Sequence, residues 1–218
     1  DKVEIVRSEP GHVNFNVYKG YGPEEYTLHR LQDKMWKLYN RTKTKEDLDL
    51  PLYRPDYRET KLDQVVHFGD DYLMSAKIDD AHQLFVFDKD KIRSFSYRES
   101  KKAPSGLIEH THKLDLPAPP KEFKNSIIRG GIFAVKEGRP VANAIIGGML
   151  NSNVWKSREQ QKVHGKLKPI IYDVDTWKGK DVTKAPYKEK LKILAEVNKS
   201  LPEFSLPDMA IEEEDKKR

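Results

Sequence analysis

A short polar run, Ser75-Ala76-Lys77-Ile78-Asp79-Asp80, places a lysine and two carboxylates between two apolar segments. Tyr72-Leu73-Met74 come just before it, and Leu84-Phe85-Val86-Phe87 follow it. Short apolar runs on either side of a polar turn are typical of neighbouring β-strands. Lys77 is therefore expected at the end of one strand, either as an exposed charge or as a nucleophile.

The composition fits a soluble globular protein. The chain has 218 residues, of which 37% are hydrophobic and 34% charged, enough for one large domain or a domain with an appendage. No apolar run approaches the roughly 20 residues of a membrane helix, and no signal pattern opens the chain. The absence of cysteine excludes disulfides and thiolate metal sites and fits the cytoplasm. The net charge of +5 suits either a nucleic-acid partner or a mildly basic surface.

The order of the expected elements indicates an α+β fold, with antiparallel strands and helices packed outside. Apolar residues at positions 28, 31, 35 and 38 predict a helix over 26–39, and residues 40–64 are expected to form a connection. Further helices are expected over 157–163 and 187–198, with a short helix or loop over 142–151. The expected strands are 13–17, 72–77, 82–88, 91–98, 107–113, 126–136 and 167–174.

Several segments, in order, resemble the motifs of covalent nucleotidyltransferases. Lys77-Ile78-Asp79-Asp80 resembles the KxDG nucleophile motif, and residues 95–98 (FSYR) resemble the strand motif that follows it. Residues 128–135 (IRGGIFAV) resemble the DGE motif with its apolar strand, and residues 170–174 (IIYDV) resemble the motif with an aromatic residue and an aspartate. The runs GKDVT at 179–183 and APYKEKL at 185–191 are similar to a signature of ATP-dependent DNA ligases, and residues 146–152 are similar to an element of phage-type members.

This resemblance implies an antiparallel-sheet nucleotidyltransferase domain, similar to the ATP-grasp-like adenylylation domain of phage and archaeal DNA ligases. In that family the lysine attacks the α-phosphate of ATP, with Mg²⁺ support, and forms lysyl-AMP. Lys77 is then the nucleophile and Asp79 the motif aspartate. The AMP passes to the 5′-phosphate of nicked double-stranded DNA, which is then sealed. A nucleophilic lysine must be partly deprotonated, which requires burial or nearby positive charge.

The same resemblance implies a set of nucleotide-binding residues. Tyr172 matches the aromatic residue that stacks on adenine, although a core aromatic would give the same pattern. Arg98 is expected to hold the nucleotide or a nucleic-acid phosphate, or to be an ordinary strand arginine. His82 is expected to face a phosphate or to have a structural or surface role. Ser75 stands where many members carry a glutamate near the adenine edge. The complete set is Ser75, Ala76, Lys77, Ile78, His82, Arg98, Gly131 and Tyr172.

Two of the motif positions depart from the family. Asp80 stands where the family has glycine, which adds a side chain and a negative charge beside the phosphates. Gly131 stands where the family has a glutamate that accepts from the ribose or helps to hold a metal ion. Together, these two changes predict impaired adenylylation, although the framework of the motifs is kept.

The resemblance covers about residues 65–205. The later EGxxxK and KxK strands and the C-terminal OB-fold domain of the family are not found in the sequence, so the adenylylation domain is expected to be incomplete. The expected division is an N-terminal helix/strand segment with its connection over 1–64, a partial nucleotidyltransferase domain over 65–205, and a charged tail or the start of a further helix over 206–218.

The sequence leaves two alternatives open. One is an impaired ligase-fold protein that binds nucleic acid or a partner without catalysis, and the other is an RNA ligase or capping-type transferase. Lys101-Lys102 and residues 158–168 offer basic groups to a nucleic-acid backbone or to solvent. His110 and His112 lie at a spacing that suits two metal ligands on one face of a strand, but no third ligand is evident.

Overall fold

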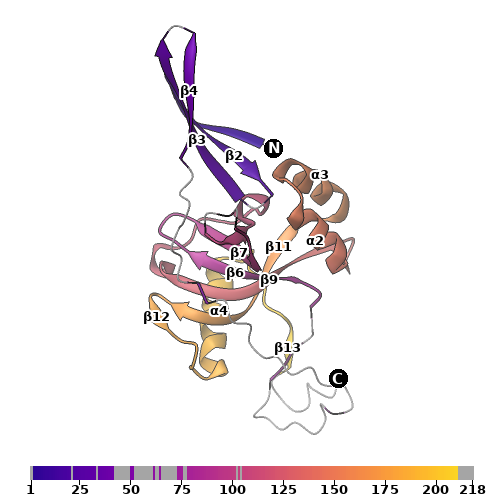
Figure 1. The fold of residues 1–218 in the computed structure, drawn as a ribbon. Coiled ribbons are helices and arrows are strands. Elements are labelled where there is room, and N and C mark those ends of the chain that lie inside the picture. The colour runs from indigo at the N-terminus through magenta and orange to yellow at the C-terminus, as the bar shows by residue number, and fades with distance from the viewer. Residues whose placement is uncertain are drawn as a thin grey trace.

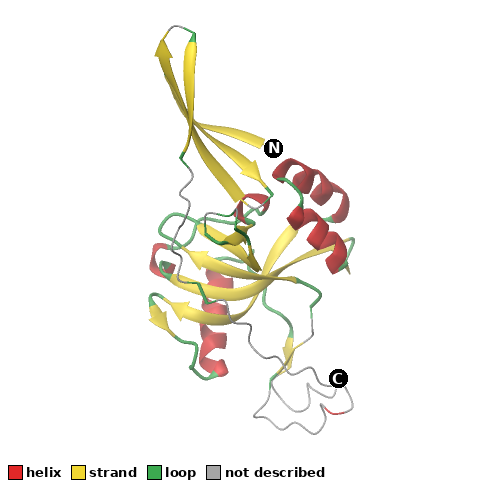
Figure 2. Cartoon of the chain, viewed as in Figure 1, coloured by secondary structure: helices red, strands yellow, loops and turns green. Residues whose placement is uncertain are grey.

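The protein is described by a computed structural model that covers residues 2–20, 22–32, 34–41, 50–51, 61, 64, 73–75, 78–101, 103 and 105–210. Strands dominate these residues, and three α-helices of nine or more residues accompany them. Figures 1 and 2 show a projecting N-terminal sheet above a larger body that holds the helices. The fold is α+β, as the sequence indicates.

The N-terminal sheet contains four antiparallel strands in sequence order. They are β1 (Lys2–Glu9), β2 (His12–Lys19), β3 (Gly22–Gln32) and β4 (Met35–Asn40). The helix predicted over 26–39 is therefore wrong. Leu28 pairs with Leu38 across the strands, and Arg30 pairs with Trp36. The apolar residues that suggested a helical period are instead cross-strand neighbours on either side of a chain reversal.

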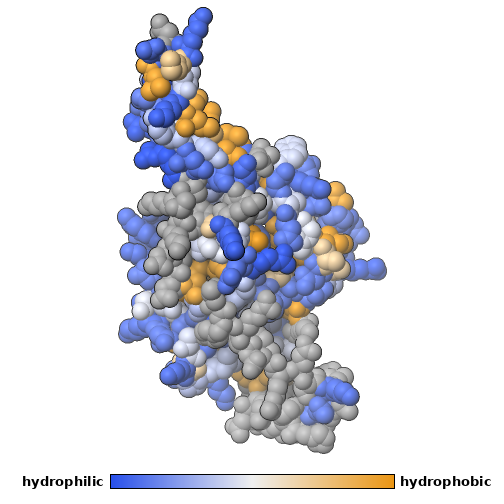
Figure 3. Space-filling view, viewed as in Figure 1, coloured by the Kyte–Doolittle hydropathy of each residue, from blue (hydrophilic) through white to orange (hydrophobic). Residues whose placement is uncertain are grey.

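One face of this N-terminal sheet is apolar. Val13 pairs with Leu28, and Phe15 pairs with both Ile5 and Tyr26, so these side chains share a face. Ile5 remains 65% exposed and Leu38 55% exposed. Figure 3 shows hydrophobic atoms along this sheet where it joins the body.

The main sheet is antiparallel throughout and has the order β12-β11-β9-β6-β7-β8, with β10 paired to β9. The strands expected over 82–88, 91–98, 126–136 and 167–174 are confirmed. The strand expected over 107–113 ends early, because a 3₁₀ helix over Thr111–Lys113 follows it. The strands are β6 (Ala81–Phe87), β7 (Ile92–Glu99), β8 (Leu107–Glu109), β9 (Ser126–Lys136), β10 (Arg139–Pro140), β11 (Leu167–Trp177) and β12 (Lys180–Asp181).

Three helices accompany the main sheet: α2 (Asn143–Asn151), α3 (Val154–His164) and α4 (Tyr187–Ser200). A second 3₁₀ helix covers Lys121–Phe123, and a short strand β5 (Met74–Ser75) pairs with β13 (Met209–Ala210). Helix α4 packs against β11. The main core lies on one face of the sheet, where α2, α4 and the segment after α4 bury Phe85, Ile128, Ile146, Ile171, Leu194 and Phe204.

The opposite face of the main sheet carries a smaller core and the polar residues of interest. Leu84, Val86 and Phe95 are buried there, and Leu50 packs against them. Side chains alternate between the two faces along each strand. Arg129 and Gly131 of β9 therefore share this second face with His82 and Leu84 of β6, their cross-strand partners.

Gly130 has no room for a side chain. A Cβ at this position would overlap the carbonyl oxygen of Ile170 and lie 2.9 Å from Cε2 of Phe85. We expect Gly130→Ala to cost about 1–3 kcal/mol, because β9 and β11 would have to separate. Gly147→Ala is the matched control, since a Cβ there has nothing within 4 Å and alanine favours the helix. Thermal unfolding of both variants checks this, and equal midpoints would contradict it.

Candidate functional site

The residues of the candidate site lie where β6 begins and where β9 and β11 run beside it. His82 pairs with Gly131, and Gly131 pairs in turn with Ile170. Gly131 is therefore at the centre of three adjacent strands. This register brings segments that resemble three separate motifs onto one face of the sheet.

His82 and Tyr172 are in direct contact. Nδ1 of His82 lies 2.6 Å from the hydroxyl oxygen of Tyr172, and the two rings meet edge to face with centroids 6.1 Å apart. The Tyr172 hydroxyl also donates to the backbone carbonyl of Gly130 at 2.8 Å. The backbone carbonyl of Tyr172 accepts from the Tyr187 hydroxyl at 2.6 Å. Both ends of Tyr172 are thus held, which fixes its half-buried ring beside His82.

The loop before β6 reaches two other elements. The exposed Asp79 accepts a hydrogen bond from the backbone N–H of Asn143 at 2.9 Å, at the first residue of α2. A carboxylate at a helix N-terminus is stabilised by the free N–H groups and by the helix dipole. Asp80 lies against Gly131, and the neighbouring Ile78 is half-buried. The carboxylates of Asp79 and Asp80 therefore contact different elements: Asp79 caps α2, and Asp80 lies against the main sheet.

The remaining expected site residues are less closely gathered. Arg98 is exposed on β7, and its Nη1 lies 3.5 Å from Oδ1 of Asn151, at the limit for a hydrogen bond. Ser75 is exposed on β5, opposite Met209. Ala76 and Lys77 lie outside the described residues. Asp80, His82, Gly131 and Tyr172 are thus brought together, whereas neither Arg98 nor Ser75 is placed in that group.

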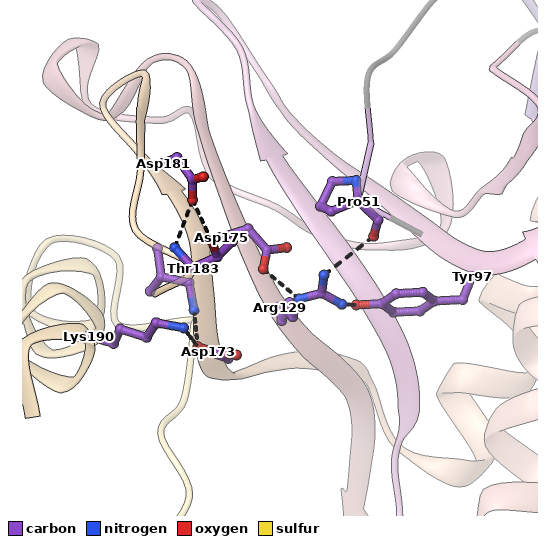
Figure 4. Close-up of polar contacts among 9 residues, drawn as sticks. Pro51, Tyr97, Arg129, Asp173, Asp175, Asp181, Thr183 and Lys190 are labelled. Carbon is purple, nitrogen blue, oxygen red and sulfur yellow. Dashed lines mark hydrogen bonds and ion pairs between the residues drawn. The ribbon is translucent and has the colours of Figure 1, made fainter. Parts of the chain in front are cut away.

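Sequence reasoning missed a buried ion pair on the same face. Nε of Arg129 donates to Oδ1 of Asp175 at 2.7 Å, and the two side chains are 1% and 2% exposed. Figure 4 shows Arg129 between Asp175 and Tyr97, whose hydroxyl oxygen accepts from Nη1 at 2.6 Å. Nη2 lies 3.4 Å from the carbonyl of Pro51. The only signal in the sequence was an arginine inside an otherwise apolar strand.

Burial shapes the electrostatics around this ion pair. It raises the pKa of Tyr97 to about 12, so the hydroxyl stays neutral beside Arg129. It also raises the pKa of Tyr187 to about 12. Lys190 of α4 forms a second ion pair, with Oδ1 of Asp173 at 2.9 Å, which ties that helix to β11 (Figure 4). One ion pair therefore joins β9 to β11, and the other joins α4 to β11.

A separate polar cluster joins the N-terminal sheet to the body. Nζ of the buried Lys113 donates to the carbonyls of Gly20, at 2.9 Å, and Leu150, at 2.5 Å. Burial lowers the pKa of this amine to about 8. Nδ1 of His110 lies 3.2 Å from Oε1 of Gln83. His110 and Lys113 were not expected to have these structural roles, and His112 lies on a 3₁₀ turn rather than on a strand.

The described residues do not gather a metal site. Among them, no three histidine or carboxylate side chains lie close enough to hold one ion, so His110 and His112 gain no third ligand. The site around Gly131 offers one carboxylate, one imidazole and one phenol ring. Such a set suits hydrogen bonding and ring contact with an organic ligand better than direct metal coordination by the protein.

Comparison with known proteins finds similarity among solved structures. No family model and no curated protein matches the chain. Among solved structures it is similar to a mycobacterial DNA ligase D complexed with ATP and MES, with a TM-score of 0.42 and 13% sequence identity. The match covers 63% of this chain and 39% of the other, so the chain spans less than half of that structure. None of the helices in the described ranges has the length and apolarity needed to cross a membrane.

Proposed function

We propose that this chain is an ATP-dependent nucleotidyltransferase domain of the DNA ligase type, with Lys77 as the nucleophile. The observation that carries the proposal is the contact between His82 and Tyr172, which are 90 residues apart in the sequence. The motif resemblance, made from sequence order alone, requires these segments to meet around one nucleotide. Their meeting on one sheet face, with Gly131 between them, supports that reading.

The proposed reaction begins at Lys77. Its neutral amine attacks the α-phosphorus of ATP, an N–P bond forms, pyrophosphate leaves with the broken P–O bond, and the amine loses a proton. Mg²⁺ bound to the phosphates of ATP would offset their negative charge during this attack. The AMP then passes to the 5′-phosphate of nicked DNA, and a 3′-hydroxyl displaces it.

Within this site, the described residues have binding and orienting roles. Tyr172 offers its ring to the adenine, and its bonds to Gly130 and Tyr187 fix the plane of that ring. His82 holds the Tyr172 hydroxyl. Asp79 anchors the loop that carries the lysine to the start of α2. A loop fixed in this way reduces the entropy lost on placing the nucleophile.

The test is the intact mass of the purified chain after incubation with ATP and Mg²⁺. We expect a gain of one AMP in the unmodified chain and in Lys89→Ala, a control at an exposed turn lysine, but none in Lys77→Ala. An adduct that persists in Lys77→Ala would overturn the assignment of the nucleophile. The absence of any adduct would contradict the proposal, and binding of nicked DNA without an adduct would favour the non-catalytic alternative.

The nucleic acid partner is tested separately. The GKDVT and APYKEKL runs favour DNA over RNA. We therefore expect AMP to transfer from the adenylylated chain to a nicked DNA duplex in preference to a nicked RNA duplex of the same sequence. Preferential transfer to RNA would support the RNA ligase alternative instead.

A further inference from the structure

Asp80 and Gly131, the two positions at which the chain departs from the motifs, are in contact with each other. A Cβ placed on Gly131 would overlap Oδ2 and Cγ of Asp80 and lie 2.9 Å from its Cβ. Gly131 does not have a positive φ, so its backbone would accept any residue. The carboxyl group of Asp80 is therefore what fills the side-chain space of position 131.

The Asp80 carboxyl group is poorly satisfied in this place. Its Oδ2 is inaccessible to solvent and has no hydrogen-bond partner among the residues that the structure describes. Burial raises the pKa of Asp80, the charge of His82 lowers it, and the neighbouring Asp79 raises it. A buried acceptor without a donor is costly, and such groups in native proteins call for an explanation in terms of function or a missing ligand.

The charge and surroundings of Asp80 limit which chemical groups of a ligand could bind its unsatisfied oxygen. A carboxylate repels phosphate groups, so the triphosphate is not the part of a nucleotide that Asp80 would face. The groups that remain are hydrogen-bond donors, and the hydroxyls of a sugar are the donors next to a base stacked on Tyr172.

We propose that Asp80 and Gly131 act as one unit, in which the loop before β6 supplies the carboxylate that faces the sugar hydroxyls of the bound nucleotide. Position 131 is a glycine because Asp80 occupies the space that a side chain there would need. The two departures from the motifs are then a single exchange of a carboxylate between two facing positions, and the site is not impaired by them. We call the contact between Asp80 and Gly131 the packing half of the proposal, and the contact between Asp80 and the sugar hydroxyls the ligand half. Only the ligand half rests on the proposed function.

The packing half is tested without nucleotide. We expect Gly131→Ala to lower the midpoint of thermal unfolding by about 3–6 °C, because its methyl group meets Asp80. In an Asp80→Gly background, the same change should cost less than about 1 °C. Gly147→Ala serves as the control, since it meets nothing in either background. An equal cost of Gly131→Ala in both backgrounds would overturn the inference.

The ligand half is tested by comparing ATP with 2′-deoxy-ATP and 3′-deoxy-ATP. A hydrogen bond to a charged group is worth about 1.5–3 kcal/mol, so the unmodified chain should bind ATP at least about 10-fold more tightly than one of the deoxy forms. Asp80→Ala should remove most of that preference, and Asp80→Gly with Gly131→Glu should restore it. A preference unchanged in Asp80→Ala would overturn the ligand half. If none of these nucleotides binds, the proposed function and the ligand half fail together, while the unfolding measurements still decide the packing half.

Discussion

Arg129→Met should lower the free energy of unfolding by about 3–5 kcal/mol, because it leaves the carboxylate of Asp175 buried without its counter-charge. The two side chains are almost completely buried, and Nε of Arg129 lies 2.7 Å from Oδ1 of Asp175. The change also removes the donor to the Tyr97 hydroxyl. Unfolding in urea, followed by tryptophan fluorescence, measures the loss.

Two further variants test whether the loss of the ion pair with Asp175, rather than any substitution of an arginine, is what lowers the stability. Arg129→Met combined with Asp175→Leu should recover most of the stability, because an apolar pair needs no solvation. Arg7→Met removes an exposed partner of Glu9, 61% and 51% exposed respectively, and should change stability little. If Arg129→Met alone were as mild as Arg7→Met, the ion pair could not be what braces these strands.

The expected loss bears on the site as well as on the fold. Arg129 lies directly before Gly130 and Gly131, and Asp175 lies on the neighbouring strand that also carries Tyr172. The ion pair thus fixes the two strands whose side chains meet at the candidate site. A stability defect in Arg129→Met should be accompanied by weaker nucleotide binding, even though Arg129 touches no proposed ligand.

The strands and helices of the body could be predicted from the sequence because local signals agreed with the final packing. The apolar runs of β6, β9 and β11 are long and flanked by turns, and Pro186 marks the start of α4. Helix α3 begins earlier than predicted because Asn153 caps it by accepting from the N–H of Lys156 at 2.9 Å. That cap was visible in the sequence as an asparagine before an apolar residue.

The strand expected over 13–17 lies within β2, but β3 and β4 were mistaken for a helix because the spacing of their apolar residues fits two periods. Leu28 and Leu38 are ten positions apart, which fits either a helical face or two strands that pair across a turn. Only the partners on β2 decide between them, and those partners are distant in sequence. Predictions that rest on local periodicity fail where long-range pairing decides the structure.

Pairings across the main sheet were hidden for the same reason. The sequence shows that Asp80 and Gly131 are unusual, but nothing in it shows that their side-chain spaces coincide. From the sequence alone they suggested an impaired site, whereas their contact is the basis for proposing a single exchange. The ion pair of Arg129 and Asp175 likewise becomes visible only when the register of β9 and β11 is known. The residues of the site were found by motif, but their relations required the fold.

Acid should destabilise the protein through His110, which links the 3₁₀ turn to Gln83. Burial, together with the charges of Lys113, His112 and Arg98, lowers the pKa of His110 to about 3. The ring is therefore neutral in the folded protein, whereas in the unfolded chain it gains a proton below pH 6.5. Stability is fully present above pH 6.5 and falls as the pH drops toward 3.

Between pH 7 and pH 5 this effect should amount to about 2 kcal/mol, because each unit below 6.5 contributes about 1.4 kcal/mol. His112 acts in the same direction, since burial lowers its pKa to about 4. Urea unfolding at several pH values measures the slope, and His110→Gln should flatten it, whatever the stability of the variant at pH 7. An unchanged slope would mean that His110 does not titrate as its burial requires.

The loss of stability in acid should be accompanied by detachment of the N-terminal sheet, because Lys113 of the same turn binds the carbonyl of Gly20. Faster amide exchange in β2 and β3 at pH 5 would show this detachment.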